Sequence, residues 1–238
     1  MEYGLIGAKL GHSYSKIIHE AVCGYSYELH PLPTEEEAHA FMQAKAFKAI
    51  NVTIPYKKLV IPYCDEVEPR AAAIGAVNTV VNRDGKLYGY NTDYTGFAYL
   101  ARCHGVKFAG AVVLVLGTGG ASQAVQYALA EAGIPYAVVS RDPARGNFLY
   151  DDLRPEVVAG HRLIVNATPV GTFPHVDEAP LLPYEALTAA HYLFDLVYNP
   201  ERTQFLLRGE RQGAHTLNGL PMLEAQAEAS WRIWNGVI

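Results

Sequence analysis

The chain has 238 residues, of which 50% are hydrophobic and 18% charged, so it can bury the core of one large or two modest domains. Its formal charge of -5, with no basic block, argues against a nucleic-acid-binding protein. No apolar run is long enough for a membrane span, and the N-terminus lacks the features of a signal peptide. We therefore expect a cytoplasmic protein that binds neither membranes nor nucleic acid.

The first hundred residues alternate short apolar runs with helical segments. Strands are predicted at 3–6, 25–29, 49–52, 76–81 and 86–90, and helices from Ser15, from Thr34 and over 93–102. Ser15 and Thr34 are of the type that caps helix N-termini, and the Asp84-Gly85 pair suits a tight hairpin turn. The βαβα order followed by a hairpin indicates an α/β domain.

From Val112 onward the apolar runs become continuous, as expected of parallel strands that are covered on both faces. This second half predicts a second α/β domain, of the nucleotide-binding type. Its strands are predicted at 112–116, 136–139, 162–165 and 192–196, with helices at 121–132 and 221–234.

A glycine-rich turn, Gly117-Thr118-Gly119-Gly120-Ala121-Ser122, joins the first of these strands to its helix. Glycines let the backbone approach a pyrophosphate, and the helix N-terminus attracts the negative charge. An ordinary tight turn is the alternative, but it would need fewer glycines. No Gly-Lys-Ser/Thr follows, so the turn is not a P-loop. A dinucleotide is therefore the predicted ligand.

The residues after the second strand of this domain indicate whether the cofactor is NAD or NADP. They read Ser140-Arg141-Asp142-Pro143-Ala144-Arg145. Arg141, backed by Arg145, favours NADP through contacts to its 2′-phosphate. Asp142 lies one position too late for the carboxylate of an NAD site, and solvated surface charge is the alternative for Arg145.

Four polar segments of the first domain follow strand ends or precede helices: His12-Ser13-Tyr14-Ser15, residues 51–57 (NVTIPYK), residues 75–79 (GAVNT) and residues 89–93 (GYNTD). Ligands of open α/β sheets bind at such carboxyl ends. The hydroxyls and amides suit a small polyhydroxylated substrate, while Lys57 and Asp93 can exchange a proton. Capping and turn formation explain any one segment but are less plausible for all four.

These motifs, in this order and together with the GTGGAS turn, resemble the shikimate dehydrogenase family, NADP-dependent enzymes that reduce 3-dehydroshikimate to shikimate. The resemblance covers nearly the whole chain. The segments that match the family's later motifs are 166–171 (NATPVG), 195–200 (DLVYNP) and 222–226 (MLEAQ).

The resemblance implies two domains, with a C-terminal helix that returns to the first. A substrate-binding catalytic domain would comprise 1–98 with 219–238, and a Rossmann-like NADP-binding domain 99–218. Lys57 would be the catalytic lysine and Asp93 its partner. The implied substrate-binding residues are Ser13, Ser15, Asn51, Thr53, Asn78, Tyr198 and Gln226, with Tyr198 approaching from the second domain. The implied NADP-binding residues are Gly117, Gly119, Gly120, Ala121, Ser140, Arg141 and Arg145.

Three departures from the family pattern stand out. Lys16 replaces the proline that usually follows the HSxS motif. Residues 168–172 (TPVGT) replace a Thr-Ser-x-Gly-Met segment whose methionine contacts the nicotinamide side. The chain is also somewhat short between Arg145 and Arg162, where a trimmed helix could loosen cofactor binding.

The resulting hypothesis is that a nicotinamide delivers hydride to the ring ketone while Lys57, or the Lys57 and Asp93 pair, supplies the proton. One alternative keeps the fold but uses quinate and NAD. Another is a non-catalytic relative that senses a metabolite. The three cysteines lack CxxC spacing, so neither a disulfide framework nor a metal site is expected. The oligomeric state is left open as monomer or homodimer.

Overall fold

The computed structural model describes residues 1–11, 13–103 and 112–237, without the side chains of Cys23 and Cys103. His12 of the first polar segment lies outside these ranges. Contacts divide the chain into unit 1, residues 1–96 and 223–238, and unit 2, residues 97–222. This division passes through two helices, α4 (Asp93–Cys103) and α8 (Leu220–Trp234), whereas the sequence-based boundaries lie after 98 and 218. The predicted return of the C-terminal helix to the first unit is confirmed.

Unit 1 is built on a mixed six-stranded sheet with the order β2-β1-β3-β5-β6-β4. Strands β2, β1 and β3 are parallel, whereas β5 pairs antiparallel with both β3 and β6. The predicted α/β class is thereby confirmed. The strands are β1 (Tyr3–Gly7), β2 (Glu28–Pro31), β3 (Ala49–Val52), β4 (Glu66–Val67), β5 (Thr79–Arg83) and β6 (Lys86–Tyr90).

The β5–β6 hairpin contains the predicted turn. Asp84 and Gly85 both have positive φ, 54° and 84°, which is the conformation of the two-residue turn that matches strand twist. The strand before the turn was predicted to begin at residue 76, but it begins at Thr79. The reason is that Val77 N–H donates to the Lys57 carbonyl, so this stretch holds the loop that carries Lys57 instead of continuing the sheet.

Two other sequence predictions for unit 1 are wrong in detail. The second strand was predicted at 25–29 but spans Glu28–Pro31, because Tyr27 N–H donates to the Glu20 carboxylate of α1 at 3.1 Å. Ser15 does not cap α1. It is the first helical residue, after a Tyr14 that makes no side-chain cap. Thr34 does cap its helix, in a reciprocal capping box with Glu37.

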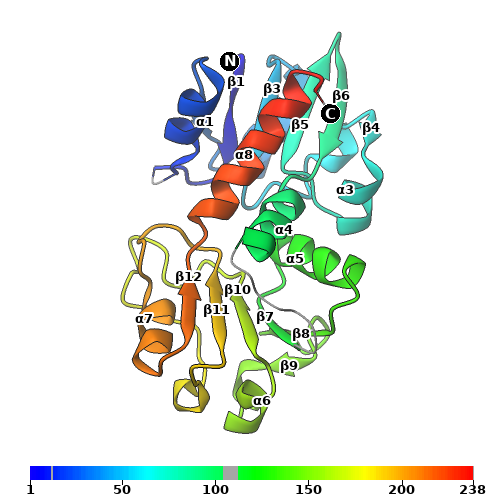
Figure 1. The fold of residues 1–238 in the computed structure, drawn as a ribbon. Coiled ribbons are helices and arrows are strands. Elements are labelled where there is room, and N and C mark those ends of the chain that lie inside the picture. Colours follow the sequence, from blue (N-terminus) through cyan, green and yellow to red (C-terminus); the bar gives the residue numbers. More distant parts are fainter. Residues whose placement is uncertain (12, 104–111, 238) are drawn as a thin grey trace. The chain divides into compact units, whose positions relative to one another are not determined.

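The helices of unit 1 pack on both faces of the sheet, since adjacent residues of β3, Ala49 and Ile50, belong to different apolar clusters with different helices. Helix α8 lies across the strands (Figure 1), with Ile233 packed against Ala49 of β3 and Val81 of β5. Burial of this apolar stripe fixes α8 to the sheet. The remaining helices are α1 (Ser15–Cys23), α2 (Glu35–Ala44) and α3 (Pro69–Ile74), with a short 3₁₀ helix at Ile61–Tyr63.

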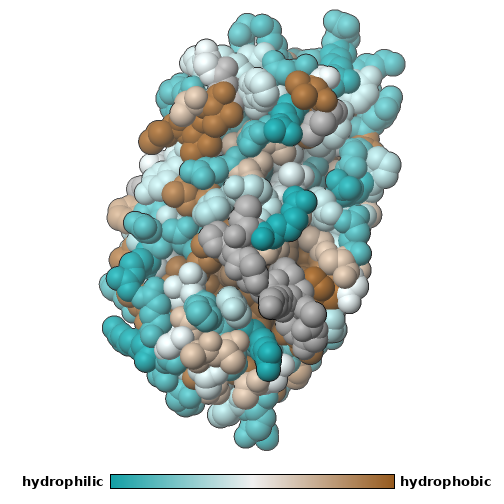
Figure 2. Space-filling model, in the orientation of Figure 1, coloured by the Kyte–Doolittle hydropathy of each residue, from teal (hydrophilic) through white to brown (hydrophobic). Residues whose placement is uncertain are grey.

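Helix α1 buries polar residues and exposes apolar ones. Ser15 and His19, one turn apart, are 6% and 0% exposed, whereas Ile17 is 70% and Val22 46% exposed. Figure 2 shows the resulting apolar patch over α1. A buried polar face is the informative observation here, because an ordinary packing helix buries its apolar side.

Unit 2 contains six parallel strands with the order β12-β11-β10-β7-β8-β9. Counted along the chain from β7, this is the 3-2-1-4-5-6 order of dinucleotide-binding domains, so the predicted Rossmann-like fold is confirmed. Such sheets bind ligands where the order reverses, here between β7 and β10. The strands are β7 (Val113–Leu116), β8 (Tyr136–Ser140), β9 (Phe148–Leu149), β10 (Leu163–Asn166), β11 (Tyr192–Asp195) and β12 (His215–Leu217).

Apolar clusters cover both faces of this second sheet. Val125 and Leu129 of α5 pack on one face, and Phe205 and Leu206 of α7 pack on the other. No helix among the described residues is long and apolar enough to cross a membrane. The helices are α5 (Gly120–Glu131), α6 (Pro155–Ala159) and α7 (Gln204–Arg211), with 3₁₀ helices at Tyr150–Asp152 and Tyr184–Ala186.

Candidate functional site

An ion pair between Lys57 and Asp93 forms the centre of the candidate site in unit 1. Lys57 Nζ lies 2.6 Å from Asp93 Oδ2, and the two side chains are only 13% and 10% exposed. Lys57 follows β3, and Asp93 is the first residue of α4. The structure therefore joins the two predicted catalytic residues in a sheltered, charge-assisted hydrogen bond.

Asn78 holds the other oxygen of the Asp93 carboxylate. Its Oδ1 accepts the backbone N–H of Thr92 at 2.8 Å, which fixes the orientation of the amide. Its Nδ2 consequently faces Asp93 Oδ1 at 3.0 Å and Thr92 Oγ1 at 3.0 Å. Asn78 is thus placed beside the predicted catalytic pair and orients it.

Asn51 is enclosed by protein groups. Its Oδ1 accepts from the Tyr27 hydroxyl at 2.8 Å. Its Nδ2 lies 3.1 Å from Thr79 Oγ1 and 2.9 Å from Ser230 Oγ. Asn51 is 4% exposed and is joined to the candidate site through this network. Among the hydrogen bonds of the described residues, none runs directly from Asn51 to Lys57 or Asp93.

Helix α8 brings Gln226 and Ser230 to the same network. Gln226 Oε1 lies 3.3 Å from Thr92 Oγ1, and its Nε2 donates to the Leu223 carbonyl at 3.0 Å. Ser230 Oγ lies 3.2 Å from Thr92 Oγ1. No role was predicted for Ser230, although its spacing of four from Gln226 places both on one helix face.

Other predicted substrate-binding residues occupy the loops at the ends of β1 and β3. Thr53 N–H donates to the Ile6 carbonyl at 2.9 Å, which ties the two strand ends together. Ser13 Oγ accepts the N–H of Ser15 at 3.2 Å at the start of α1. These three residues share no hydrogen bond with the Lys57 and Asp93 pair in the described structure. Tyr198 belongs to unit 2, in the loop after β11.

In unit 2, the glycine turn passes close to the end of β10. Gly117 has a φ of +100°, and a Cβ there would come within 2.8 Å of Thr168 Cγ2. A side chain would be both strained and crowded, so glycine is required. Ser122, the departure from the usual third small residue, donates its hydroxyl to the Gly117 carbonyl at 2.6 Å and braces the turn.

The start of α5 offers free N–H groups to an anion. Gly119 is the N-cap, and the first helical hydrogen bond runs from Gln123 N–H to its carbonyl. The N–H groups of Gly120 and Ala121 precede that bond and have no acceptor within the helix. A Cβ on Gly119 would meet no atom within 4 Å, so the cap is open. This cradle fits the diphosphate of a dinucleotide.

The loop after β8 carries the two predicted arginines. Arg145 donates to the Thr118 carbonyl of the glycine turn at 2.8 Å, and Arg141 is exposed. Ser140 Oγ accepts the N–H of Asp142 at 3.0 Å, and Asp142 Oδ1 accepts the N–H of Ala144 at 2.9 Å. Asp142 thus shapes the turn and leaves the arginines for a phosphate.

A buried carboxylate that the sequence analysis did not single out lies at the end of β11. Asp195 is 0% exposed and accepts from Asn166 Nδ2 at 2.9 Å and from Thr203 Oγ1 at 2.5 Å. Burial raises the pKa of Asp195 to about 7, although its hydrogen-bond donors act in the opposite direction. Asn166 in turn holds Thr168, whose hydroxyl donates to its Oδ1 at 2.6 Å. This network fixes the segment that faces the glycine turn.

The two units together hold the parts that a nicotinamide-dependent reduction requires. Unit 1 supplies a sheltered ammonium and carboxylate with hydroxyl and amide groups around them, and unit 2 supplies a phosphate cradle with two arginines. Within the described ranges, no three His, Cys, Asp or Glu side chains gather so as to hold a metal ion.

The chain is similar to known proteins. A family model described as the shikimate dehydrogenase substrate binding domain matches residues 5–80. A shikimate dehydrogenase (NADP(+)) of Carboxydothermus hydrogenoformans is 37% identical, over 98% of this chain and 91% of the relative. The match therefore includes both units.

Solved structures agree with this similarity. Shikimate 5-dehydrogenase from Thermus thermophilus, solved in complex with NADP(H) and shikimate, has a TM-score of 0.87 at 36% identity and covers 99% of this chain and 94% of its own. Shikimate dehydrogenase 1 from Peptoclostridium difficile has a TM-score of 0.86 at 35% identity, with 99% and 92% covered.

Proposed function

The chain belongs to the shikimate dehydrogenase family, and from this membership we propose that it catalyses the reversible, NADPH-dependent reduction of 3-dehydroshikimate to shikimate. The activity is that of an oxidoreductase acting on a CH–OH group, in the route to chorismate and the aromatic amino acids. The observation that carries the proposal is the Lys57 and Asp93 pair, 2.6 Å apart and largely sheltered. A non-catalytic sensor would have no need for this pair.

Lys57 is the proton donor in this proposal. When bound, NADPH supplies the hydride that reduces the ring ketone. The oxygen of the ketone then gains negative charge, and the ammonium of Lys57, or the Lys57 and Asp93 pair, transfers a proton to it. In the reverse direction the same groups accept the proton of the substrate hydroxyl. Asp93 keeps Lys57 in place, because its second oxygen is held by Asn78 Nδ2 at 3.0 Å.

The substrate is held by polar side chains of unit 1. Ser13 and Ser15, at the start of α1, would bind the substrate carboxylate or hydroxyls, and Thr53 lies in the loop that precedes Lys57. Gln226 keeps one N–H for a substrate oxygen, since the other donates to Leu223 and no further acceptor lies among the described residues. The remaining proposed substrate-binding residues are Asn51 and Asn78 of unit 1, together with Tyr198 of unit 2.

The cofactor is held by unit 2. The open N-terminus of α5, with Gly119, Gly120 and Ala121, suits the diphosphate, and Gly117 gives the backbone its close turn. Arg141 and Arg145 would pair with the 2′-phosphate that distinguishes NADP from NAD. Ser140 shapes the loop that presents them, through its bond to Asp142 N–H.

The protein is proposed to act in the cytoplasm as a monomer or homodimer, on a small-molecule substrate. The test of the function is absorbance at the reduced-nicotinamide band, with shikimate or quinate and with NADP or NAD. We expect a rapid signal with shikimate and NADP. A faster signal with quinate and NAD would show that these are the preferred substrate and cofactor. No signal in any of the four mixtures would reject the proposal that the protein is an enzyme of this kind.

A further inference from the structure

We propose that Ser230 of α8 is a positioning residue for the reaction, acting through Thr92 and Asn78 on the Asp93 carboxylate. The inference rests on the proposed function, since it needs Lys57 and Asp93 to be the reacting pair. It adds a residue from the C-terminal helix that touches neither ligand nor catalytic atoms.

Ser230 is fully buried at a junction of three polar side chains. Its Oγ lies 2.9 Å from Asn51 Nδ2, 2.9 Å from Thr79 Oγ1 and 3.2 Å from Thr92 Oγ1. These partners come from β3, from the start of β5 and from the residue before α4. A single hydroxyl thus ties α8 to the three segments that surround the candidate site.

The proton count gives the hydroxyl a defined role. Ser230 donates its only proton to the Gln226 carbonyl at 3.0 Å, one turn earlier in α8. Its oxygen therefore acts only as an acceptor toward the network. One lone pair takes an N–H of Asn51, and the other takes the hydroxyl proton of Thr79 or Thr92. Ser230 is thus a fixed acceptor that directs the protons of its neighbours.

Hydrogen bonds connect Thr92 to Asp93 through Asn78. Thr92 Oγ1 accepts from Asn78 Nδ2 at 3.0 Å, so its own proton must point to another acceptor, which Ser230 offers. The second N–H of Asn78 donates to Asp93 Oδ1 at 3.0 Å. Without Ser230, the acceptors left to the threonine hydroxyls are Asn78 Oδ1, which already accepts the N–H of Thr92, and Gln226 Oε1, which lies 3.3 Å from Thr92 Oγ1. The bond from Thr92 N–H to Asn78 Oδ1 remains, but the threonine hydroxyls then compete for the same oxygen. We expect the Asn78 amide, and with it the Asp93 carboxylate, to be held less firmly.

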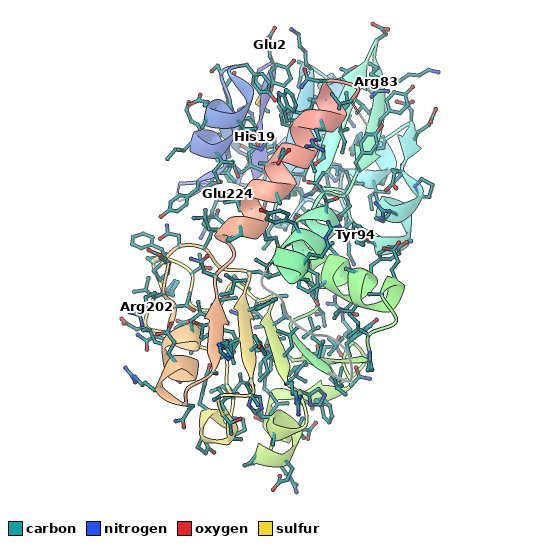
Figure 3. The ribbon with its side chains drawn as sticks, viewed as in Figure 1. Glu2, His19, Arg83, Tyr94, Arg202 and Glu224 are labelled. Carbon is teal, nitrogen blue, oxygen red and sulfur yellow. The ribbon has the colours of Figure 1, made fainter. Side chains whose placement is uncertain are left out.

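The same residue explains why α8 is polar where it crosses the sheet. Gln226 and Ser230 are 8% and 0% exposed, whereas Glu224 points to the outer face of the helix (Figure 3). An apolar residue at 230 would pack equally well but would leave donors of Asn51 and Thr79 with one acceptor fewer. Burial alone therefore does not account for a serine here.

The test compares Ser230→Ala with Tyr56→Phe in the assay with shikimate and NADP. Tyr56→Phe is the matched control, because it also removes one buried hydroxyl of unit 1, which donates to the Leu32 carbonyl at 2.6 Å outside this network. We expect Ser230→Ala to lower kcat about 3- to 10-fold, with an unchanged KM for NADP. Tyr56→Phe should keep kcat within about twofold.

A double-mutant cycle separates positioning from general destabilisation. In the Lys57→Ala background, Ser230→Ala should change the residual rate by less than about twofold, because the pair it orients is gone. An equal loss in both backgrounds, or an equal loss in Tyr56→Phe, overturns the proposal. Should Ser230→Ala fail to fold, Ser230→Cys keeps the shape of the side chain, at a slightly larger size, with a weaker hydrogen-bonding group, and its kcat should fall in the same direction.

The two proposals fail in distinguishable ways. Near-normal turnover of Lys57→Ala rejects the proposed function, whatever Ser230 does. An inactive Lys57→Ala together with an unaffected Ser230→Ala rejects only the positioning role.

Discussion

Lys57 Nζ and Asp93 Oδ2 lie 2.6 Å apart although 36 residues separate them in the sequence. The order of the strands in the sheet explains why these two residues are adjacent in space. Strands β3 and β6 are both antiparallel to β5, so their carboxyl ends lie at one edge of the sheet. Lys57 follows β3, Asp93 follows β6, and Asn78 precedes β5 at that same edge. The topology alone therefore brings the ammonium, the carboxylate and the amide together.

Replacement of Lys57 by alanine should lower kcat by about two to four powers of ten, the usual contribution of a positioned general acid. The KM for NADP should stay close to that of the wild type. Steady-state kinetics with shikimate and NADP provide the measurement. Lys58→Ala is the matched control, since the neighbouring lysine is exposed and lies in the same loop. Similar losses in both variants would show that the loop, and not the Lys57 ammonium, matters.

Replacement of Arg141 by alanine should shift the cofactor preference. A hydrogen bond to a charged group contributes roughly 1.5–3 kcal/mol, so kcat/KM for NADP should fall about 10- to 100-fold. The value for NAD, which has no 2′-phosphate, should stay within about threefold. The control is Arg211→Ala, an exposed arginine in the last turn of α7. Parallel losses with both cofactors would contradict a phosphate contact.

Much of the fold follows from strong local signals. Strands at 49–52 and 86–90 were predicted with the bounds that the structure shows. The first is a short apolar run, and the second begins directly after the Asp84-Gly85 turn. The continuous apolar strands of unit 2 and the glycine turn likewise predict its dinucleotide-type sheet. Lys57 and Asp93 were found because they stand in polar motifs at strand ends.

The connections between motifs were not predictable in the same way. Ser230 stands on a helix whose spacing is also that of ordinary core packing, so nothing in the sequence marks it as a junction. Tyr27 was placed inside a strand, whereas its ring stacks on His19 with centroids 4.2 Å apart and its hydroxyl reaches Asn51. Asp195 was noted only as part of the segment 195–200, which matches a family motif, and no role was predicted for it. Local patterns identify polar residues, but tertiary packing decides which of them face each other.

Ionisation of Asp195 should make unit 2 less stable as the pH rises. Burial raises the pKa of its carboxyl to about 7 in the folded state, so the folded chain binds the proton more tightly than the unfolded one. The stabilisation is complete below about pH 4 and is lost as the pH rises through about 7. Asp195→Asn cannot ionise, and its amide can still accept from Asn166 and donate to Thr203.

Urea unfolding at pH 4.5 and pH 8 checks this expectation. Relative to the wild type, the free energy of unfolding of Asp195→Asn should rise between the two pH values by up to about 3 kcal/mol, at about 1.4 kcal/mol for each pKa unit. The control is Asp151→Asn, an exposed carboxylate of the same unit, whose curve should run parallel to that of the wild type. Parallel curves for Asp195→Asn as well would rule out a carboxyl that is easier to protonate in the folded state.

Protonation of His19 should make unit 1 less stable as the pH falls, which is the opposite pH dependence to that of Asp195. The residue belongs to α1 (Figure 3), is 0% exposed, and its ring stacks on Trp234 of α8 with centroids 5.2 Å apart. Burial lowers its pKa to about 4, so the folded state favours the neutral ring. This stabilisation is present above about pH 6.5 and is lost as the pH falls toward 4, by up to about 3 kcal/mol.

The opposite pH dependences of Asp195 and His19 can be measured separately, because the two residues lie in different units. Both tryptophans, Trp231 and Trp234, belong to unit 1, so tryptophan fluorescence reports the unfolding of the unit that contains His19. In the Asp195→Asn background, the fluorescence transition should move to lower urea between pH 6.5 and pH 4. His19→Phe keeps a stacked ring that cannot be protonated and should remove most of this shift, whereas His175→Asn, which alters an exposed histidine of unit 2, should leave it intact. An acid shift that persists in His19→Phe would assign the pH dependence to other groups of unit 1.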